Sequence, residues 1–166
     1  AGSHGLVLRR CGGPGIRDAG PEAKGAIIGL SDVHTRAHVY RAILEGLGYA
    51  LRHGREKIER TTRQPVRRLR VAGGGSQSDV AMQITADVFG LPAERPHVYE
   101  ASALGAAINA AVGTGMHPDY RTAVRAMTPV GDVFEPEPAA VRTYHPPSTR
   151  VYERMYGRMT PCDRPL

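Results

Sequence analysis

Apolar residues in this chain fall into short continuous segments and into longer stretches with a spacing of three to four residues. The first segment, GAIIGLS at residues 25–31, lies between glycines and predicts a short buried strand. Residues 35–61 predict a long amphipathic helix with Thr35 as its N-cap. The apolar face of that helix comprises Val39, Ile43, Leu47, Ala50 or Leu51, and Ile58.

Two glycines, Gly46 and Gly48, lie inside this helical pattern. A glycine in a helix interior costs about 1 kcal/mol relative to alanine. The helix is therefore either interrupted at this point or packed against another backbone, and we expect close packing.

A second strand and helix flank three consecutive glycines, Gly73 to Gly75. Residues 66–72 predict a strand that is partly buried on both faces. The helix after the glycines ends at Gly90 in a left-handed cap. Its predicted buried face comprises Val80, Ala81, Ile84 and Val88.

The start of this second helix has two candidate N-caps. Ser76 and Asp79 match a capping box, in which an acidic residue follows the capping serine after three positions. Ser78 is the alternative N-cap.

Farther along, residues 97–100 (HVYE) predict a brief strand, and Ser102 caps a helix of small residues, ALGAAINAAVG. These small residues either let the helix approach a neighbour closely or reflect only the high helix propensity of alanine. A further helix starts at Pro118. Its predicted buried residues are Ala123, Val124 and Met127.

The last part of the chain combines prolines with one more amphipathic pattern. Pro129, Pro136 and Pro138 predict an extended linker. A C-terminal helix follows, and we expect its tyrosines and methionines to pack in the core rather than around a cofactor. Its apolar positions are Val151, Tyr152, Met155, Tyr156 and Met159.

Strands and helices alternate along the chain without an internal repeat, which indicates an α/β layer architecture. Residues 1–24 are rich in glycine and predict an irregular leader apart from the short apolar run Leu6 to Leu8. Residues 1–4 within it resemble a cloning remnant. We expect a core at residues 25–130, completed by a linker and C-terminal helix at residues 131–166.

The composition and charge of the chain limit the classes of molecule that it is expected to bind. A net charge of +6 and a pI of about 9.7 fit either an anionic partner or an arginine-rich proteome. The basic residues are scattered and no nucleic-acid module accompanies them, so we expect no nucleic-acid partner. No segment reaches the ~20 apolar residues of a membrane span, so we expect no membrane contact. Cys11 and Cys162 show no metal-ligand spacing and favour a reducing cytoplasm.

The three glycines place bare backbone between a strand and a helix N-terminus. In this arrangement backbone N–H groups and the positive end of the helix face an anion or a nucleotide. Glycine carries no Cβ, so a phosphate, a ribose or a flat base can approach its backbone. The segment GGGSQS matches neither the phosphate loop that ends in GK[ST] nor the GxGxxG fingerprint. By itself it indicates only an anion or nucleotide site.

Three motifs, in this order, resemble the FGGY family of carbohydrate kinases. GAIIGLSDVHTRAHVYRAILE at residues 25–45 is similar to the family's second signature. LRVAGGGSQSDVAMQITADVFGLP at residues 69–92 is similar to its adenosine-side loop and the following helix. EASALGAAINAAVG, which begins at Glu100, is similar to its next helix.

The resemblance implies an actin-like ATPase lobe of the ribonuclease-H-like class, with a mixed sheet and packed helices. Two such lobes close on ATP, and this chain resembles most of the second one. The full-length protein would transfer the γ-phosphate of ATP to a sugar or polyol hydroxyl, with carbohydrate bound mainly by the first lobe. ATP or ADP would be the nucleotide, and Mg²⁺ would be held through the nucleotide and the missing lobe.

The resemblance also implies which residues contact the nucleotide. In the family's loop these are the second glycine and the residue four positions later, which correspond to Gly74 and Ser78. Gly73 and Gly75 flank them and shape the floor of the site. Ser78 stands where glycerol kinases have an asparagine, so its side chain is shorter.

The catalytic aspartate and most sugar contacts of the family belong to motifs upstream of those present here. We therefore assign no catalytic residue and no metal ligand in this chain, and expect the isolated chain to be inactive. His34 and His38 flank a helix start and are expected to be surface or capping residues. A pseudokinase-like or dimerisation module with the same fold is the alternative. The identity of the carbohydrate and the formation of a homo-oligomer stay open.

Overall fold

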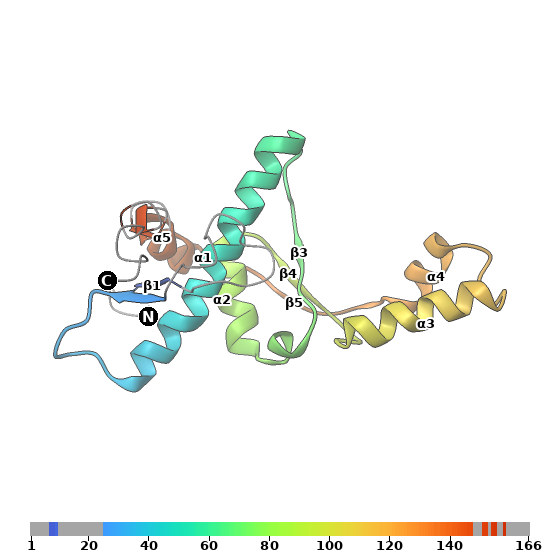
Figure 1. Ribbon diagram of the computed structural model, residues 1–166, viewed down its shortest axis with the longest axis horizontal. Helices are drawn as coiled ribbons and strands as arrows, with labels where there is room; N and C mark the ends of the chain where they lie inside the picture. The colour runs from blue at the N-terminus through green and yellow to red at the C-terminus, as the bar shows by residue number, and fades with distance from the viewer. Residues whose placement is uncertain (1–6, 10–24, 148–150, 153, 156–157, 159–166) are drawn as a thin grey trace, which may run out of the picture. The chain divides into compact units, whose positions relative to one another are not determined.

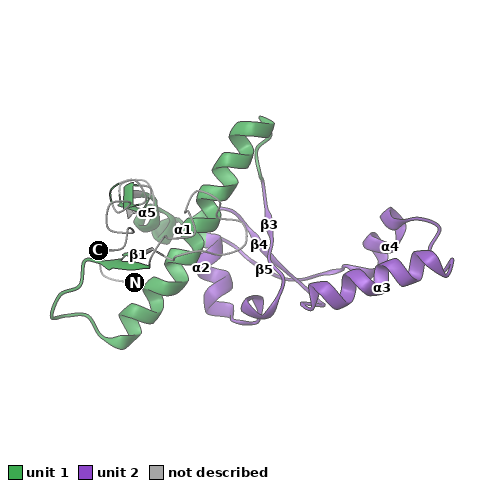
Figure 2. Cartoon of the chain, viewed as in Figure 1, with its two compact units in different colours: residues 1–66, 87–90, 136–166 green, residues 67–86, 91–135 purple. Residues whose placement is uncertain are grey.

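The computed structural model describes residues 7–9, 25–147, 151–152, 154–155 and 158 (Figure 1). The chain divides into two compact units, which Figure 2 shows in different colours. The first unit consists of residues 1–66, 87–90 and 136–166, and the second of residues 67–86 and 91–135. In the part of the chain that is described, no helix is long and apolar enough to cross a membrane.

The first unit contains a small antiparallel sheet and long helices. Strand β1, Val7–Arg9, pairs with β2, Ala26–Ile28, so that Val7 lies opposite Ile28. Helix α1 spans Arg36–Thr62 and contacts β1, and α5 spans Pro138–Pro147. Apart from β1, the predicted leader lies outside the described residues, as do Cys11 and Cys162.

The strand predicted at residues 25–31 is present as β2, but its predicted burial is wrong. Ile27 and Ile28 are 40% and 42% exposed. Among the described strands β2 pairs only with β1. A strand in a two-stranded sheet is covered on fewer sides than a central strand of a larger sheet.

The long helix predicted after Thr35 is confirmed, and so is its N-cap. Thr35 and His38 form a reciprocal capping box, in which the Thr35 N–H donates to His38 Nδ1 at 3.1 Å. The Ser31 N–H donates in the same way to His34 Nδ1 at 3.0 Å. Both histidines therefore serve as local caps, as expected.

The predicted buried face of α1 is partly wrong. Val39, Leu47 and Ala50 are half-buried, but Ile43, Leu51 and Ile58 are exposed, and the helix fully buries a different set of residues. The buried residues are Ala42, Glu45, Gly46, Gly48, Tyr49 and Arg52. Three of these six residues are alanine or glycine, whose small size permits close packing. A Cβ on Gly48 would lie 3.2 Å from Val88 Cγ1, so close packing is confirmed at Gly48, but against a side chain and not against another backbone.

The buried face of α1 carries charges that are paired inside the unit. Tyr144 Oη on α5 donates to Glu45 Oε1 at 3.1 Å, and Arg41 donates to both groups. Arg52 Nη1 donates to the carbonyl of Val88 at 2.9 Å. Burial and the nearby Glu45 carboxylate raise the pKa of Tyr49, so that this phenol stays neutral.

The tyrosine and methionine positions of the C-terminal segment contribute to the same core. Tyr152 and Met155 are buried, and the Tyr152 ring lies 5.7 Å from that of Tyr49. This confirms core packing for those two residues. Tyr156 and Met159 lie outside the described residues.

The second unit is built on a mixed three-stranded sheet in the order β3-β4-β5. Strand β3, Leu69–Arg70, runs parallel to β4, Ala93–Pro96, which runs antiparallel to β5, Val130–Phe134. Helices α2, Asp79–Phe89, and α3, Ala101–Gly113, follow the two parallel strands. Helix α4 spans Tyr120–Met127.

A small apolar core holds this sheet to α2. Met82, Ala86 and Ala93 are buried, and half-buried side chains of the outer strands pack against them. Leu69 and Val71 lie on the same face of the β3 segment, so it is buried on one face and not on both. The predicted face of α2 is partly wrong, because Val80 is 56% exposed and Met82 is buried in its place. Gly90 closes α2 with a φ of 63°, as predicted.

Two strand predictions fail in this unit. No strand forms at residues 97–100, and the strand of this region is β4 at Ala93–Pro96. Its sequence lacks an apolar pattern because it contains Glu94, which is buried and paired with Arg68 and Arg70. The linker expected between Pro129 and Pro138 contains β5. Pro138 then begins α5, a helix that the sequence pattern did not predict, and a proline at the first helical position leaves no hydrogen bond unmade.

Helices α3 and α4 contact each other. The N-cap of α3 is Glu100 and not Ser102. Ala111 is buried, but most small residues of α3 are exposed, which favours the explanation from alanine propensity. On α4, Ala123 is buried as predicted, whereas Val124 is 42% exposed.

Candidate functional site

The three glycines form a tight turn at the carboxyl end of β3. Gly73 has φ 94° and ψ 176°, a conformation that is essentially restricted to glycine. Residues Gly74–Gln77 continue as one 3₁₀ turn, and α2 begins at Asp79. The sequence prediction of a strand, a glycine turn and a helix N-terminus is therefore confirmed as local structure.

Hydrogen bonds within the turn fix its shape. Ser76 is fully buried, and both its N–H and its Oγ donate to the carbonyl of Gly73, at 3.0 and 2.7 Å. The N–H of Gly73 donates to the carbonyl of Tyr99 at 2.8 Å, which ties the turn to the segment after β4. Ser76 therefore has a structural role inside the turn.

Ser78, and not Ser76, is the N-cap of α2. Its Oγ accepts the N–H of Ala81 at 3.3 Å, and its backbone is extended with φ −88° and ψ 113°. A serine hydroxyl that accepts one hydrogen bond keeps its own proton for donation. Because Ser78 is exposed, that proton can be donated to a ligand.

The face of the turn is open to an approaching ligand. A Cβ placed on Gly73, Gly74 or Gly75 would meet no atom within 4 Å. The turn therefore presents backbone that no side chain of its own covers. The structure thus brings Gly73, Gly74, Gly75 and Ser78 together on one turn.

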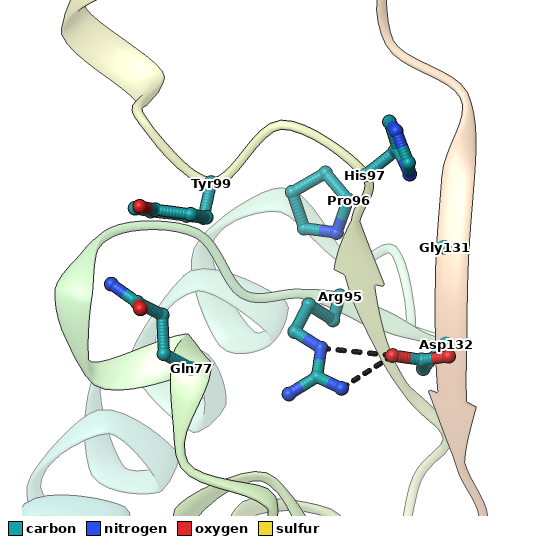
Figure 3. Close-up of a pocket in the computed structure, with 7 residues that line it drawn as sticks. All are labelled: Gln77, Arg95, Pro96, His97, Tyr99, Gly131 and Asp132. Atoms are coloured by element: carbon teal, nitrogen blue, oxygen red, sulfur yellow. Dashed lines mark hydrogen bonds and ion pairs between the residues drawn. The ribbon is translucent and has the colours of Figure 1, made fainter.

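A hollow of about 310 Å³ lies in the same unit (Figure 3). Gln77 of the turn and Tyr99 line it together with residues of β4 and β5, while the four predicted site residues do not. The full lining is Gln77, Arg95, Pro96, His97, Tyr99, Gly131 and Asp132. Tyr99 and Gln77 therefore connect the glycine turn to this hollow.

Arg95 is the most connected charged residue of the hollow. Its Nη1 donates to the carbonyl of Ser76 at 3.1 Å and to Asp79 Oδ1 at 2.7 Å. Its Nε donates to Asp132 Oδ2 at 3.1 Å, and its Nη2 also pairs with that carboxylate. These hydrogen bonds, first to Asp132 and then to Asp79, raise the pKa of Arg95.

The described residues contain no cluster of three or more His, Cys, Asp or Glu side chains that could hold a metal ion. The carboxylates of Asp79 and Asp132 are both paired with Arg95. The site consists of open backbone and one serine hydroxyl, next to a hollow that is lined by Tyr99 and by the paired Arg95.

Sequence reasoning identified the turn but missed Arg95, Tyr99 and the hollow. Arg95 follows Glu94 in a strand that carries no alternating apolar pattern. Its partners Ser76 and Asp132 are 19 and 37 positions away. No local signal links such positions.

Similarity to known proteins shows which family this chain belongs to. Residues 7–114 match the model of the FGGY family of carbohydrate kinases, C-terminal domain. The chain is 40% identical over 124 residues to the uncharacterized sugar kinase YgcE of Escherichia coli, covering 75% of this chain and 25% of that protein. It is also 40% identical over 144 residues to the L-xylulose/3-keto-L-gulonate kinase of the same organism, covering 85% and 26%.

Solved structures of carbohydrate kinases share the fold of this chain. A xylulose kinase from Rhodospirillum rubrum matches with a TM-score of 0.79 and 32% identity, over 98% of this chain and 32% of that one. A Plasmodium falciparum glycerol kinase with ADP shares the fold, with a TM-score of 0.70 and 19% identity over 92% and 31%. The chain spans about a quarter of the curated relatives that it matches. It belongs to the FGGY family of carbohydrate kinases, as a C-terminal domain with the actin-like ATPase fold.

Proposed function

We propose that this chain is the nucleotide-binding lobe of an ATP-dependent sugar or polyol kinase. In the whole protein, the γ-phosphate of ATP would pass to a carbohydrate hydroxyl, with carbohydrate bound mainly by the other lobe. The observation that carries the proposal is the open glycine turn between β3 and α2, which leaves bare backbone at a helix N-terminus. Relatives that include a glycerol kinase, an L-xylulose/3-keto-L-gulonate kinase and a xylulose kinase support it.

We assign the nucleotide contacts to Gly73, Gly74, Gly75 and Ser78. The three glycines offer backbone without obstruction, and Gly74 is the residue against which the adenosine would lie. Ser78 would donate its hydroxyl proton to an acceptor nitrogen or oxygen of the nucleoside, because its Oγ lone pair already accepts from Ala81. This role differs from that of an asparagine, which offers two donors and an acceptor.

The hollow next to the turn supports the same assignment. Tyr99 presents an aromatic ring there, and a base stacked on an aromatic ring gains about 1–3 kcal/mol. Gln77 supplies an amide that can both donate and accept on the same side. These groups suit a flat heteroaromatic ring better than a bare phosphate.

Binding by this chain alone should be weak. Millimolar affinity already requires about 4 kcal/mol, whereas a helix terminus stabilises an anion by only ~0.3–2 kcal/mol. Phosphoryl transfer also needs Mg²⁺ and donors on both sides of the transferred group. We place Mg²⁺ on the nucleotide and the other lobe, and expect no phosphate transfer by the isolated chain.

Two measurements test this proposal. Titration of ¹⁵N-labelled protein with ADP should shift the amides of residues 73–78, with a Kd in the millimolar range. A coupled assay with ATP, Mg²⁺ and a panel of ketoses and polyols should show no turnover. Micromolar ADP affinity by calorimetry, or turnover with any sugar, would contradict the weak, inactive lobe. The absence of ADP-dependent shifts would contradict nucleotide binding.

The proposal extends to the chain's organisation and surroundings. We propose that residues 25–130 form the core of the lobe and that residues 131–166, which include most of β5 and all of α5, complete it. A cytoplasmic location and the absence of a nucleic-acid partner remain part of the proposal, on the strength of the composition.

A non-catalytic pseudokinase-like or dimerisation module is the second candidate function. The outward apolar face of α1 favours it, since Tyr40, Leu51 and Ile58 are each more than half exposed. Sedimentation of the chain tests this candidate. A dimer that Leu51→Lys dissociates would support a homo-oligomer, and a monomer at all concentrations would contradict it.

A further inference from the structure

Arg95 joins three segments of the second unit through one planar side chain. Its Nη1 reaches the glycine turn at the carbonyl of Ser76 and the start of α2 at Asp79. Its Nε and Nη2 reach Asp132 on β5, as the dashed lines in Figure 3 show. The guanidinium carbon lies 5.3 Å from the centre of the Phe134 ring. A guanidinium has fixed donor directions, so these partners fix one another's positions.

The first of these contacts, with the carbonyl of Ser76, affects the shape of the glycine turn. The carbonyl of Ser76 lies inside the 3₁₀ turn, between Gly74 and Ser78, and the side chain of Ser76 is already bonded back to Gly73. A donor that holds this carbonyl fixes the peptide plane between Ser76 and Gln77. That plane lies between Gly75 and Ser78, two of the residues that the nucleotide is proposed to contact.

The contact with Asp79 acts on the other end of the turn. Asp79 is the first residue of α2 and directly follows the N-cap Ser78. Its carboxylate is 74% exposed, yet Arg95 holds it at 2.7 Å. The pairing also neutralises a negative charge at the place where an anionic ligand would approach the helix N-terminus.

We infer that Arg95 is a positioning residue for the nucleotide: its bonds to the Ser76 carbonyl and to Asp79 hold the turn in its binding shape. This inference rests on the proposed nucleotide site at Gly73–Gly75 and Ser78. A turn that samples other shapes binds with an affinity reduced by the fraction of molecules in the competent shape.

Two comparisons separate this role from general support of the sheet. Arg68 also pairs a carboxylate of the same sheet, with Nη1 3.1 Å from Glu94, but makes no bond to the turn. Lysine at position 95 keeps the charge and loses the fork that reaches Ser76 and Asp132 together. Arg95→Lys and Asp79→Asn therefore test the turn, and Arg68→Lys is the matched control.

The experiment is an ADP titration of the ¹⁵N-labelled full chain, well below the melting temperature of each variant. We expect Arg95→Lys and Asp79→Asn to raise the Kd for ADP by about three- to tenfold and to shift the free-state amides of residues 74–78. Arg68→Lys should leave both unchanged. Because Asp79→Asn retains Arg95, it keeps the test valid if Arg95→Lys fails to fold.

The possible failures are distinguishable. A wild-type chain without any ADP-dependent shift would overturn the proposed function, and this inference with it. A wild-type chain that binds ADP while Arg95→Lys and Asp79→Asn bind it equally well would overturn the inference alone. An equal loss of affinity in Arg68→Lys would also overturn it, since the effect would then belong to the sheet.

Discussion

The N–H of Gly73 donates a hydrogen bond to the carbonyl of Tyr99 at 2.8 Å. This bond joins the segments that follow the carboxyl ends of β3 and β4, which are neighbouring parallel strands. It places the glycine turn beside the tyrosine that lines the hollow. The candidate site is thus a property of the sheet edge and not of the turn alone.

Gly73→Ala should destabilise the second unit by about 1–3 kcal/mol, because an alanine at φ 94° is strained even though its Cβ would meet no neighbour. Urea unfolding measures this. Gly74→Ala is the matched control, since its backbone needs no positive φ and its Cβ also has free space. It should unfold like wild type but bind ADP more weakly. Equal stability of the two variants would contradict the strain argument.

Two glycines of α1 should respond in opposite directions to alanine. At Gly54 a Cβ would meet nothing within 4 Å, so Gly54→Ala should stabilise the helix by about 0.5–1 kcal/mol. At Gly48 the Cβ would lie 3.2 Å from Val88, which should cancel or reverse that gain. Urea unfolding of both variants tests the difference. Adding Val88→Ala to Gly48→Ala should relieve part of the crowding, and an unaltered penalty would speak against it.

Gly131→Ala should be more disruptive, because its Cβ would lie 2.9 Å from the carbonyl oxygen of Arg95, a backbone atom that cannot rotate away. We expect a loss of about 1–3 kcal/mol in unfolding free energy. Hydrogen exchange should also quicken at the amide of His97, which donates to Pro129 across the same strand pair. Gly105→Ala on α3 has free space and serves as the control. Normal protection at His97 would argue against displacement of β5.

Tyr144→Phe should cost about 1–3 kcal/mol, because it removes a hydroxyl that bonds a nearly fully buried carboxylate, Glu45. Denaturant unfolding of the first unit measures this cost. Tyr40→Phe removes a hydroxyl from a side chain that is 65% exposed and should change stability by no more than about 0.5 kcal/mol. Similar values for the two variants would mean that the Arg41–Glu45–Tyr144 network contributes little.

Asp119 should make α4 sensitive to acid. Its carboxylate accepts the N–H of Thr122 at 2.7 Å, and this bond lowers the pKa of Asp119 below its ordinary value. A lowered pKa in the folded state stabilises the helix above the ordinary aspartate pKa of about 4, and this stabilisation disappears as pH falls through the folded value. Hydrogen exchange of α4 amides should therefore quicken at acid pH. Asp119→Asn, which can still cap but cannot titrate, should lack this dependence.

Local signals in the sequence were sufficient for the elements with strong punctuation. Thr35, the three glycines and Gly90 each mark a boundary through a cap or a backbone conformation that few residues adopt, and the structure has α1, the turn and α2 where they were predicted. Strand β4 was misplaced because a buried Glu94, neutralised by Arg68 and Arg70, does not look like a strand interior. Strand β5 was missed because prolines flank it.

The sequence alone determined the family motifs, the positions of α1 and α2 and the glycine turn, because those features depend on neighbours within a few positions. Only the tertiary structure decided which face of α1 is buried, since the small residues Ala42 and Gly48 permit close packing that a hydrophobic pattern does not reveal. It also decided which side chains lie around the turn, because Arg95 is on the neighbouring strand β4 and Tyr99 follows that strand. Contacts between residues distant in sequence arise from strand pairing, and no local spacing specifies them.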